Sequence, residues 1–169
     1  ANGRYGDVVE MLDWSTGQVL DALREAGVER DTLVIFTSDN GPWMDMPPRM
    51  LVDPRVLRTD AGSAGPLRGS KGTSWEGGTR VPFIARWPGR IPAGSVSPGL
   101  AATMDLLPTV AGIAGAALPQ GRVVDGQDIR AFLEGRGPSP REWFFYYDSG
   151  GRLEGVRDDR WKPHGRFPD

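Results

Sequence analysis

The hydrophobic pattern of the first third of the chain predicts an amphipathic helix followed by a buried strand. Apolar residues recur at the i, i+4 and i+7 positions typical of one helix face between Tyr5 and Ala26. Gly27 supplies a helix stop signal, and the run Thr32–Thr37 is apolar enough for the interior of a sheet. A helix followed closely by a buried strand favours an α/β layer architecture. The members of the helical stripe are Val8, Leu12, Val19 and Leu23.

The middle of the chain is irregular and then returns to short regular elements. Residues 41–79 show little periodicity, and a loop of that length is typical of either a functional segment or disorder. Arg80–Trp87 is predicted to be a second strand, with Pro82 near its start, where proline is tolerated. Asp105–Ala114 is predicted to be a helix, with Asp105 or Thr103 near its N-cap and a proline in its first turn.

The last third of the chain predicts a small β-rich region. Asp128–Leu133 is expected to form a short helix that ends at Gly135. Trp143–Tyr147 and Leu153–Arg157 are short runs of strand-forming residues separated by turn residues, which favours an antiparallel meander. We place a boundary near residue 118, so that residues 1–118 form the main α/β part and residues 119–169 a small antiparallel subdomain.

Composition and charge exclude several classes of function. The 169 residues include 20 basic and 22 acidic side chains, and no basic stripe indicates a nucleic-acid partner. No apolar run approaches the length of a membrane span. The chain has no cysteine, which excludes disulfides, thiolate metal sites and a cysteine nucleophile, and leaves the redox compartment open. Its one histidine, His164, excludes multi-histidine zinc sites and is interpreted as a surface residue.

The first candidate for chemistry is the pair Asp39 and Asn40, which directly follows the strand Thr32–Thr37. Carboxylate and amide oxygens are hard ligands suited to Ca²⁺ or Mg²⁺, and α/β folds place ligands at the carboxyl ends of strands. Two ligands cannot complete a calcium site, which takes six to eight oxygens. On the dipeptide alone, an Asx-type or hairpin turn is the alternative interpretation.

The second candidate is Lys71 in the glycine-rich run Gly69–Gly78, "GSKGTSWEGG". Glycines allow the backbone to approach a ligand closely, and an ammonium held there suits an anionic oxygen. The order of residues is not that of a P-loop, so nucleotide binding is unsupported. A solvated surface lysine is the alternative, and Ser74 and Glu76 have the character of polar loop supports.

Taken together and in order, these motifs resemble the carboxyl-terminal half of type I sulfatases, the arylsulfatase family. The segments that carry the resemblance are "TLVIFTSDNG", "SKGTSWEGGTRVPF", "MDLLPTVAGIAGAALP" and "DGQDI". It covers nearly the whole chain and implies a partial alkaline-phosphatase-like α/β fold, with a helix and a mixed sheet, followed by a small antiparallel β-rich subdomain. It also implies that the intact enzyme hydrolyses sulfate esters of aryl or carbohydrate substrates.

The resemblance assigns roles to individual residues. Asp39 and Asn40 match the family's Ca²⁺ ligands, and Lys71 matches the lysine that contacts the sulfate oxygens. The family's nucleophile is a formylglycine made from Cys or Ser in a C/S-x-P-S-R motif, which this sequence lacks. The chain is therefore expected to be a sulfatase segment without the nucleophile region, inactive alone and exported (periplasmic, secreted or lysosomal) by resemblance only.

Two alternatives remain open at this point. In the first, the chain is a non-catalytic module or a half that pairs with a separate N-terminal sulfatase segment. In the second, it belongs to a related phosphodiester or phosphonate hydrolase. The full run "SKGTSWEGGTRVPF" favours the sulfatase over the related hydrolases.

Overall fold

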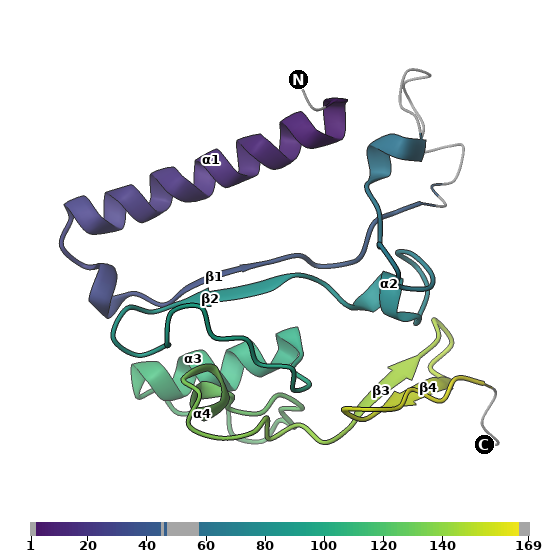
Figure 1. Ribbon diagram of the computed structural model, residues 1–169. Helices are drawn as coiled ribbons and strands as arrows, with labels where there is room; N and C mark the ends of the chain where they lie inside the picture. Colours follow the sequence, from purple (N-terminus) through teal and green to yellow (C-terminus); the bar gives the residue numbers. More distant parts are fainter. Residues whose placement is uncertain (1–2, 45, 47–57, 166–169) are drawn as a thin grey trace. The chain divides into compact units, whose positions relative to one another are not determined.

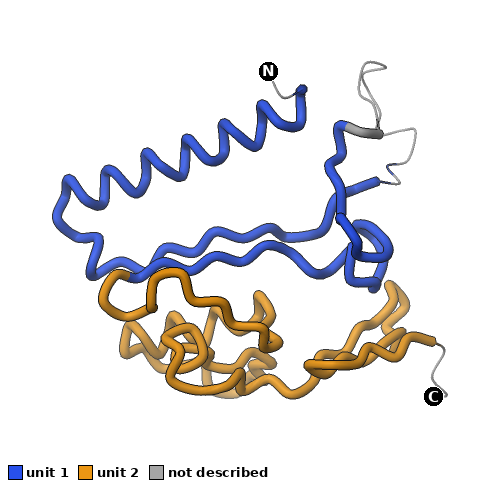
Figure 2. Tube along the Cα trace, in the orientation of Figure 1, with its two compact units in different colours: residues 1–87 blue, residues 88–169 orange. Residues whose placement is uncertain are grey.

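A computed structural model describes residues 3–44, 46 and 58–165 of the chain (Figure 1). The chain divides into two compact units, unit 1 (Ala1–Trp87) and unit 2 (Pro88–Asp169), which are coloured separately in Figure 2. The predicted division into residues 1–118 and 119–169 stays a prediction.

The described residues of unit 1 form a long helix, a two-stranded antiparallel ribbon and three short helical segments. Helix α1 spans Gly3–Glu25, close to the predicted Tyr5–Ala26, and runs through Gly17 without interruption. Strand β1 (Val34–Thr37) pairs with β2 (Phe83–Arg86) in antiparallel register, from Val34 opposite Arg86 to Thr37 opposite Phe83. The short segments are η1 (Glu29–Asp31), η3 (Arg58–Ala61) and α2 (Glu76–Thr79).

The β1–β2 pairing decides one of the alternatives left open by the sequence. The strand partner of β1 begins at Phe83, so Asn40-Gly41 is not the turn of a tight hairpin. Residues 38–82 form a long connection instead, and Thr37 closes it where the strands end, because its hydroxyl donates to the Pro82 carbonyl at 2.9 Å. The candidate residues all lie in this connection.

The other end of the ribbon is fixed by Trp87. Its side chain is buried, and its indole N–H donates to the Arg30 carbonyl in η1 at 2.8 Å. Arg86 pairs with Glu29 of the same segment at 2.9 Å. The turn after α1 is thereby attached to the end of β2, at the end of the ribbon opposite the candidate site.

Unit 2 contains a helical part and a β-hairpin. The helices are α3 (Leu106–Ala114), preceded by the 3-10 turn η4 (Thr103–Asp105), and α4 (Arg130–Leu133). Strands β3 (Phe144–Tyr147) and β4 (Leu153–Arg157) pair antiparallel with an irregularity between Tyr146 and Tyr147, which confirms the predicted meander. His164 forms an isolated antiparallel bridge with Gly155. Both units combine helices with an antiparallel pair of strands, which confirms the expected α/β class.

Asp105 in unit 2 lies at the N-cap position of α3, as predicted, but its side chain bonds to other parts of the chain. The side chain makes no capping hydrogen bond to that helix. Its fully buried carboxylate instead accepts hydrogen bonds from the backbone N–H groups of Ala102 and Gln127, at 2.8 and 2.9 Å, and forms an ion pair with Arg141. This network joins the start of α3 to residues far along the chain.

Helix α1 has the length of a membrane span but not the apolar character. It carries charged residues at intervals along its whole length, including Asp7, Glu10 and Asp13. Within the part of the chain that the structure describes, no helix meets both conditions for crossing a bilayer.

Candidate functional site

The segment that follows β1 is held against α2 by its backbone. The Ser38 hydroxyl donates to the Asn40 carbonyl at 2.9 Å, which bends the chain directly after the strand. The Gly41 N–H then donates to the Gly78 carbonyl at 3.0 Å. A Cβ atom on Gly41 would lie 1.8 Å from the Gly77 carbonyl oxygen, so only glycine fits there. The Asp39–Asn40 pair is thus positioned by a close backbone approach that no side chain could make.

The glycine-rich run is folded by its own hydrogen bonds and is attached to the same segment. The Thr73 hydroxyl donates to the Ser70 carbonyl at 2.8 Å, and the Gly77 N–H donates to the Arg68 carbonyl at 2.7 Å. The Lys71 N–H donates to the Pro42 carbonyl at 2.9 Å. Lys71 lies far from Asp39 and Asn40 in the sequence. These bonds attach it to Pro42, which follows the pair closely in the chain.

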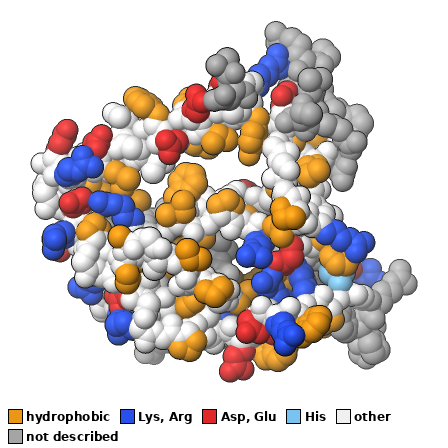
Figure 3. Space-filling view, viewed as in Figure 1, with side chains coloured by type: hydrophobic (Ala, Val, Ile, Leu, Met, Phe, Trp, Pro, Cys, Tyr) orange, Lys and Arg blue, Asp and Glu red, His pale blue; other side chains and the backbone are white. Residues whose placement is uncertain are grey.

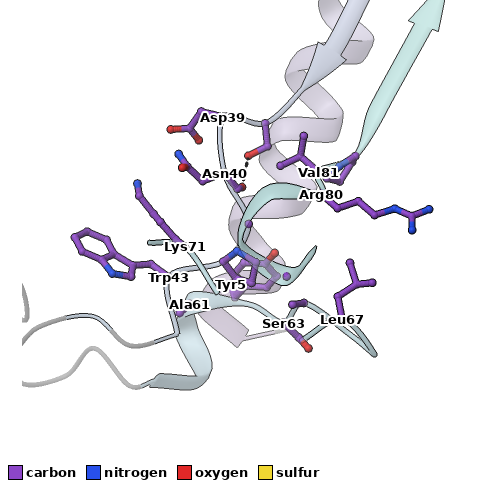
Figure 4. Close-up of a pocket in the computed structure, with 16 residues that line it drawn as sticks. Tyr5, Asp39, Asn40, Trp43, Ala61, Ser63, Leu67, Lys71, Arg80 and Val81 are labelled. Carbon is purple, nitrogen blue, oxygen red and sulfur yellow. Dashed lines mark hydrogen bonds between the residues drawn. The ribbon is translucent and has the colours of Figure 1, made fainter. Parts of the chain in front are cut away.

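All three predicted site residues line one cavity of about 680 Å³ in unit 1, a volume typical of small-molecule sites. Figure 4 shows the side chains of Asp39, Asn40, Lys71 and Trp43 extending to the same side, whereas Arg80 extends to the other. The structure therefore brings together the two oxygen-bearing side chains and the ammonium that the sequence singled out. The rest of the wall is mostly apolar or small, with Tyr5, Pro42, Ala61, Ala64, Leu67, Val81 and Pro82 among its residues.

The oxygens of the pair are available to a ligand. Asp39 is exposed and Asn40 is half-buried, and neither side chain hydrogen-bonds to another residue in the described ranges. Carboxylate and amide oxygens suit a hard cation such as Ca²⁺. Among the described residues, no group of three or more His, Cys, Asp or Glu side chains is arranged to hold a metal ion. The pair therefore offers two oxygen donors, fewer than the six to eight that Ca²⁺ takes.

The structure adds three residues that the sequence did not identify as part of the site. Trp43 lies in the cavity wall with the Lys71 ammonium 5.0 Å from its ring centroid. Tyr5 reaches the wall from α1, and its ring lies against Gly62, where a Cβ atom would be 2.7 Å from it. Arg80 lines the far side and pairs with Glu76 at 4.0 Å. Only Trp43 had a local signal, since it lies close to Asp39 in the sequence.

Unit 1 thus places two oxygen-bearing side chains and a lysine around one cavity. The comparisons with known proteins give the family. Residues 2–116 match the family model described as Sulfatase. Mouse steryl-sulfatase is 44% identical over 156 residues, and human arylsulfatase A is 40% identical over 166 residues.

The similarity extends to solved structures. The crystal structure of the PsFucS1 sulfatase from Pseudoalteromonas sp. superposes with a TM-score of 0.80 and 37% identity over 94% of this chain. The chain belongs to the sulfatase family. It spans 24% of the mouse steryl-sulfatase, 30% of human arylsulfatase A and 30% of the Pseudoalteromonas protein, although 92%, 96% and 94% of its own residues are matched.

Proposed function

We propose that this chain supplies the sulfate- and calcium-binding side of a sulfuric ester hydrolase. The observation that carries the proposal is the convergence of Asp39, Asn40 and Lys71 on one cavity through hydrogen bonds between two loops distant in sequence. The match of residues 2–116 to the sulfatase family supports sulfate over phosphodiester or phosphonate as the anion.

In this proposal Lys71 binds the sulfate oxygens. The negative charge on those oxygens changes during cleavage of the ester, and a fixed ammonium stabilises it best where water is partly excluded. Lys71 meets this requirement because it is half-buried and its backbone is attached to Pro42. It cannot replace an attacking group, so the nucleophile, by resemblance a formylglycine, has to come from sequence that this chain does not contain.

Asp39 and Asn40 fit the calcium ion that the family resemblance implies. Both donors are oxygens, both line the cavity, and neither is engaged with another described residue. Calcium bound there would supply positive charge beside the sulfate group. The two side chains would hold one side of the ion, and the remaining ligands would be water or residues from outside the described ranges.

Replacing Lys71 with alanine is expected to weaken the binding of inorganic sulfate to the chain about tenfold, because a charge-assisted hydrogen bond is lost. The measurement is calorimetric titration with sodium sulfate at low ionic strength. Lys162→Ala is the matched control, since Lys162 also lies over an aromatic ring, that of Tyr146, but does not line the cavity. Equal sulfate affinity in the Lys71 variant and the parent would show that the assigned role of Lys71 is wrong.

Replacing Asp39 with asparagine is expected to abolish measurable calcium binding. The unaltered chain should bind Ca²⁺ with a dissociation constant on the order of millimolar, because most of the coordination shell is water. The substitution keeps the size of the side chain and removes its charge. Titration with CaCl₂ followed by the amide NMR signals of Asn40 and Gly41 is the measurement. Asp31→Asn, in η1, is the control, and a calcium response that survives Asp39→Asn would contradict the assignment.

A second candidate function is supported by the surface of α1. The helix buries none of its side chains, and its apolar face exposes Val8, Leu12 and Val19 at 48–55%. Figure 3 shows hydrophobic side chains along the helix. Because the solved sulfatase that this chain resembles is more than three times longer, we propose that a separate sulfatase segment covers this face.

The chain alone is expected to show no turnover of an aryl sulfate, and mixing it with the N-terminal part of a sulfatase should restore activity. Leu12→Lys should prevent this complementation because it places a charge on the apolar face of α1. Gln18→Lys, outside the apolar stripe of the same helix, should leave it intact. Turnover by the unmixed chain would contradict the first expectation, and equal complementation by both variants would contradict the second.

A further inference from the structure

Trp43 is an aromatic residue of the cavity wall that lies beside Lys71. Its side chain is half-buried and lines the same cavity as Asp39, Asn40 and Lys71. The Lys71 ammonium lies 5.0 Å from the centroid of its ring. The catalytic assignments above leave this residue without a role.

The indole is presented by a fixed backbone. Pro42, immediately before it, has a restricted φ, and the Pro42 carbonyl accepts the Lys71 N–H at 2.9 Å. One residue earlier, Gly41 is bound to Gly78 at 3.0 Å. A backbone held in this way loses little conformational freedom when a ligand binds against the side chain that it carries, which favours a recognition role.

The position of the ring relative to the ammonium determines what it can contact. An anion oxygen bound to the Lys71 ammonium would lie about 2.8 Å from it. Since the indole centroid lies 5.0 Å from the same nitrogen, the ring is within contact distance of a group joined to the bound sulfate. Part of the remaining wall, including Tyr5, Leu67 and Val81, is apolar and suits the organic part of an ester better than a second charge.

We propose that Trp43 is the specificity residue of this site, selecting sulfate esters of a ring with an apolar face by stacking against that face while Lys71 binds the sulfate. The inference rests on the proposed function. The ring can be aromatic or a pyranose, because both offer an apolar face to an indole. A sulfate ion without an organic group gains nothing from Trp43 beyond its contact with Lys71.

The test compares three ligands on the full chain by calorimetric titration: inorganic sulfate, para-nitrophenyl sulfate and a monosulfated galactose. We expect the unaltered chain to bind at least one ring ester on the order of tenfold more tightly than inorganic sulfate. Trp43→Ala should remove that preference and leave the affinity for inorganic sulfate nearly unchanged, whereas Trp43→Phe should retain most of it. Trp161→Ala is the matched control, since Trp161 also lies beside a cation, Arg160, but does not line the cavity.

Each outcome separates this inference from the proposed function. A chain that binds inorganic sulfate without preferring a ring ester, or a preference that survives Trp43→Ala, would overturn the inference and leave the role of Lys71 standing. A chain that binds none of the three ligands would overturn both. If Trp43→Ala weakens all three ligands equally, the indole acts only by positioning Lys71, and the assigned specificity role is wrong.

Discussion

Substituting Gly41 with alanine is expected to destabilise unit 1 by about 3 kcal/mol or more and to remove the site with it. The added Cβ would lie 1.8 Å from the Gly77 carbonyl oxygen, which is backbone. That backbone has no room to retreat, because Gly77 is itself packed on Gly69, and a Cβ on Gly77 would lie 2.2 Å from the Gly69 carbonyl oxygen. The backbones of Gly41, Gly77 and Gly69 are stacked here. A shift that relieves the clash at one of them would therefore create a clash at the next.

Gly17→Ala is the control, and its effect on stability is expected to have the opposite sign. Gly17 lies within α1, and an added Cβ would have no neighbour within 4 Å, so alanine is expected to raise stability by about 1 kcal/mol through its better helix propensity. Urea unfolding of both variants, followed by circular dichroism, is the measurement. A Gly41→Ala protein as stable as the parent would mean that the segment after β1 is not packed on α2.

Replacing Arg141 with alanine is expected to destabilise unit 2 by about 3–5 kcal/mol, because it leaves a buried carboxylate without its counter-charge. Asp105 is fully buried, and Arg141 is only 9% exposed. The guanidinium also donates to the Asp125 carbonyl at 3.0 Å, so the substitution leaves that acceptor unsatisfied as well. Arg152→Ala is the control, since the Arg152–Asp148 pair lies at the surface and its loss should be barely measurable.

The pH dependence of the Arg141 variant gives a second, independent measurement. Burial by itself raises the pKa of the Asp105 carboxyl, but the hydrogen bonds from Arg141, Gln127 and Ala102 outweigh it and hold the pKa below 3.8. In the parent, this carboxylate therefore stabilises the fold above pH 3.8, and the contribution is lost as the pH falls through the lower folded pKa. Without Arg141 the folded pKa rises, so protonation relieves the buried charge.

The difference in unfolding free energy between the parent and Arg141→Ala should therefore shrink as the pH falls from about 7 to about 4. Urea unfolding at several pH values measures it. A difference that stays constant over this range would show that Asp105 is not left charged and buried in the variant, and that Arg141 acts through packing alone. Asp105→Asn should remove the pH dependence of the difference, because no titrating group remains at that position.

Much of the secondary structure was predictable from the sequence. The helical stripe predicted α1 within two residues at each end, and the apolar runs predicted β1 and β2 with extra residues at their ends. These predictions succeeded because backbone geometry sets the periods of helices and strands, and those periods are visible in neighbouring residues. The N-cap position of Asp105 was predicted, but its ion pair with Arg141 was not, because a local pattern cannot register a partner that lies far along the chain.

The sequence by itself determined which side chains are candidates for the site. Two hard oxygen donors after a strand, and a lysine among glycines, predicted a hard cation and an anion as ligands, and the order of the motifs indicated the sulfatase family. It did not determine that these side chains share a cavity. Only the tertiary structure decided this, because the glycine backbones after β1 and in α2 approach closely enough for two distant loops to hydrogen-bond. The same close approach places Trp43 beside Lys71. This contact depends on long-range packing, so the sequence around neither residue predicts it.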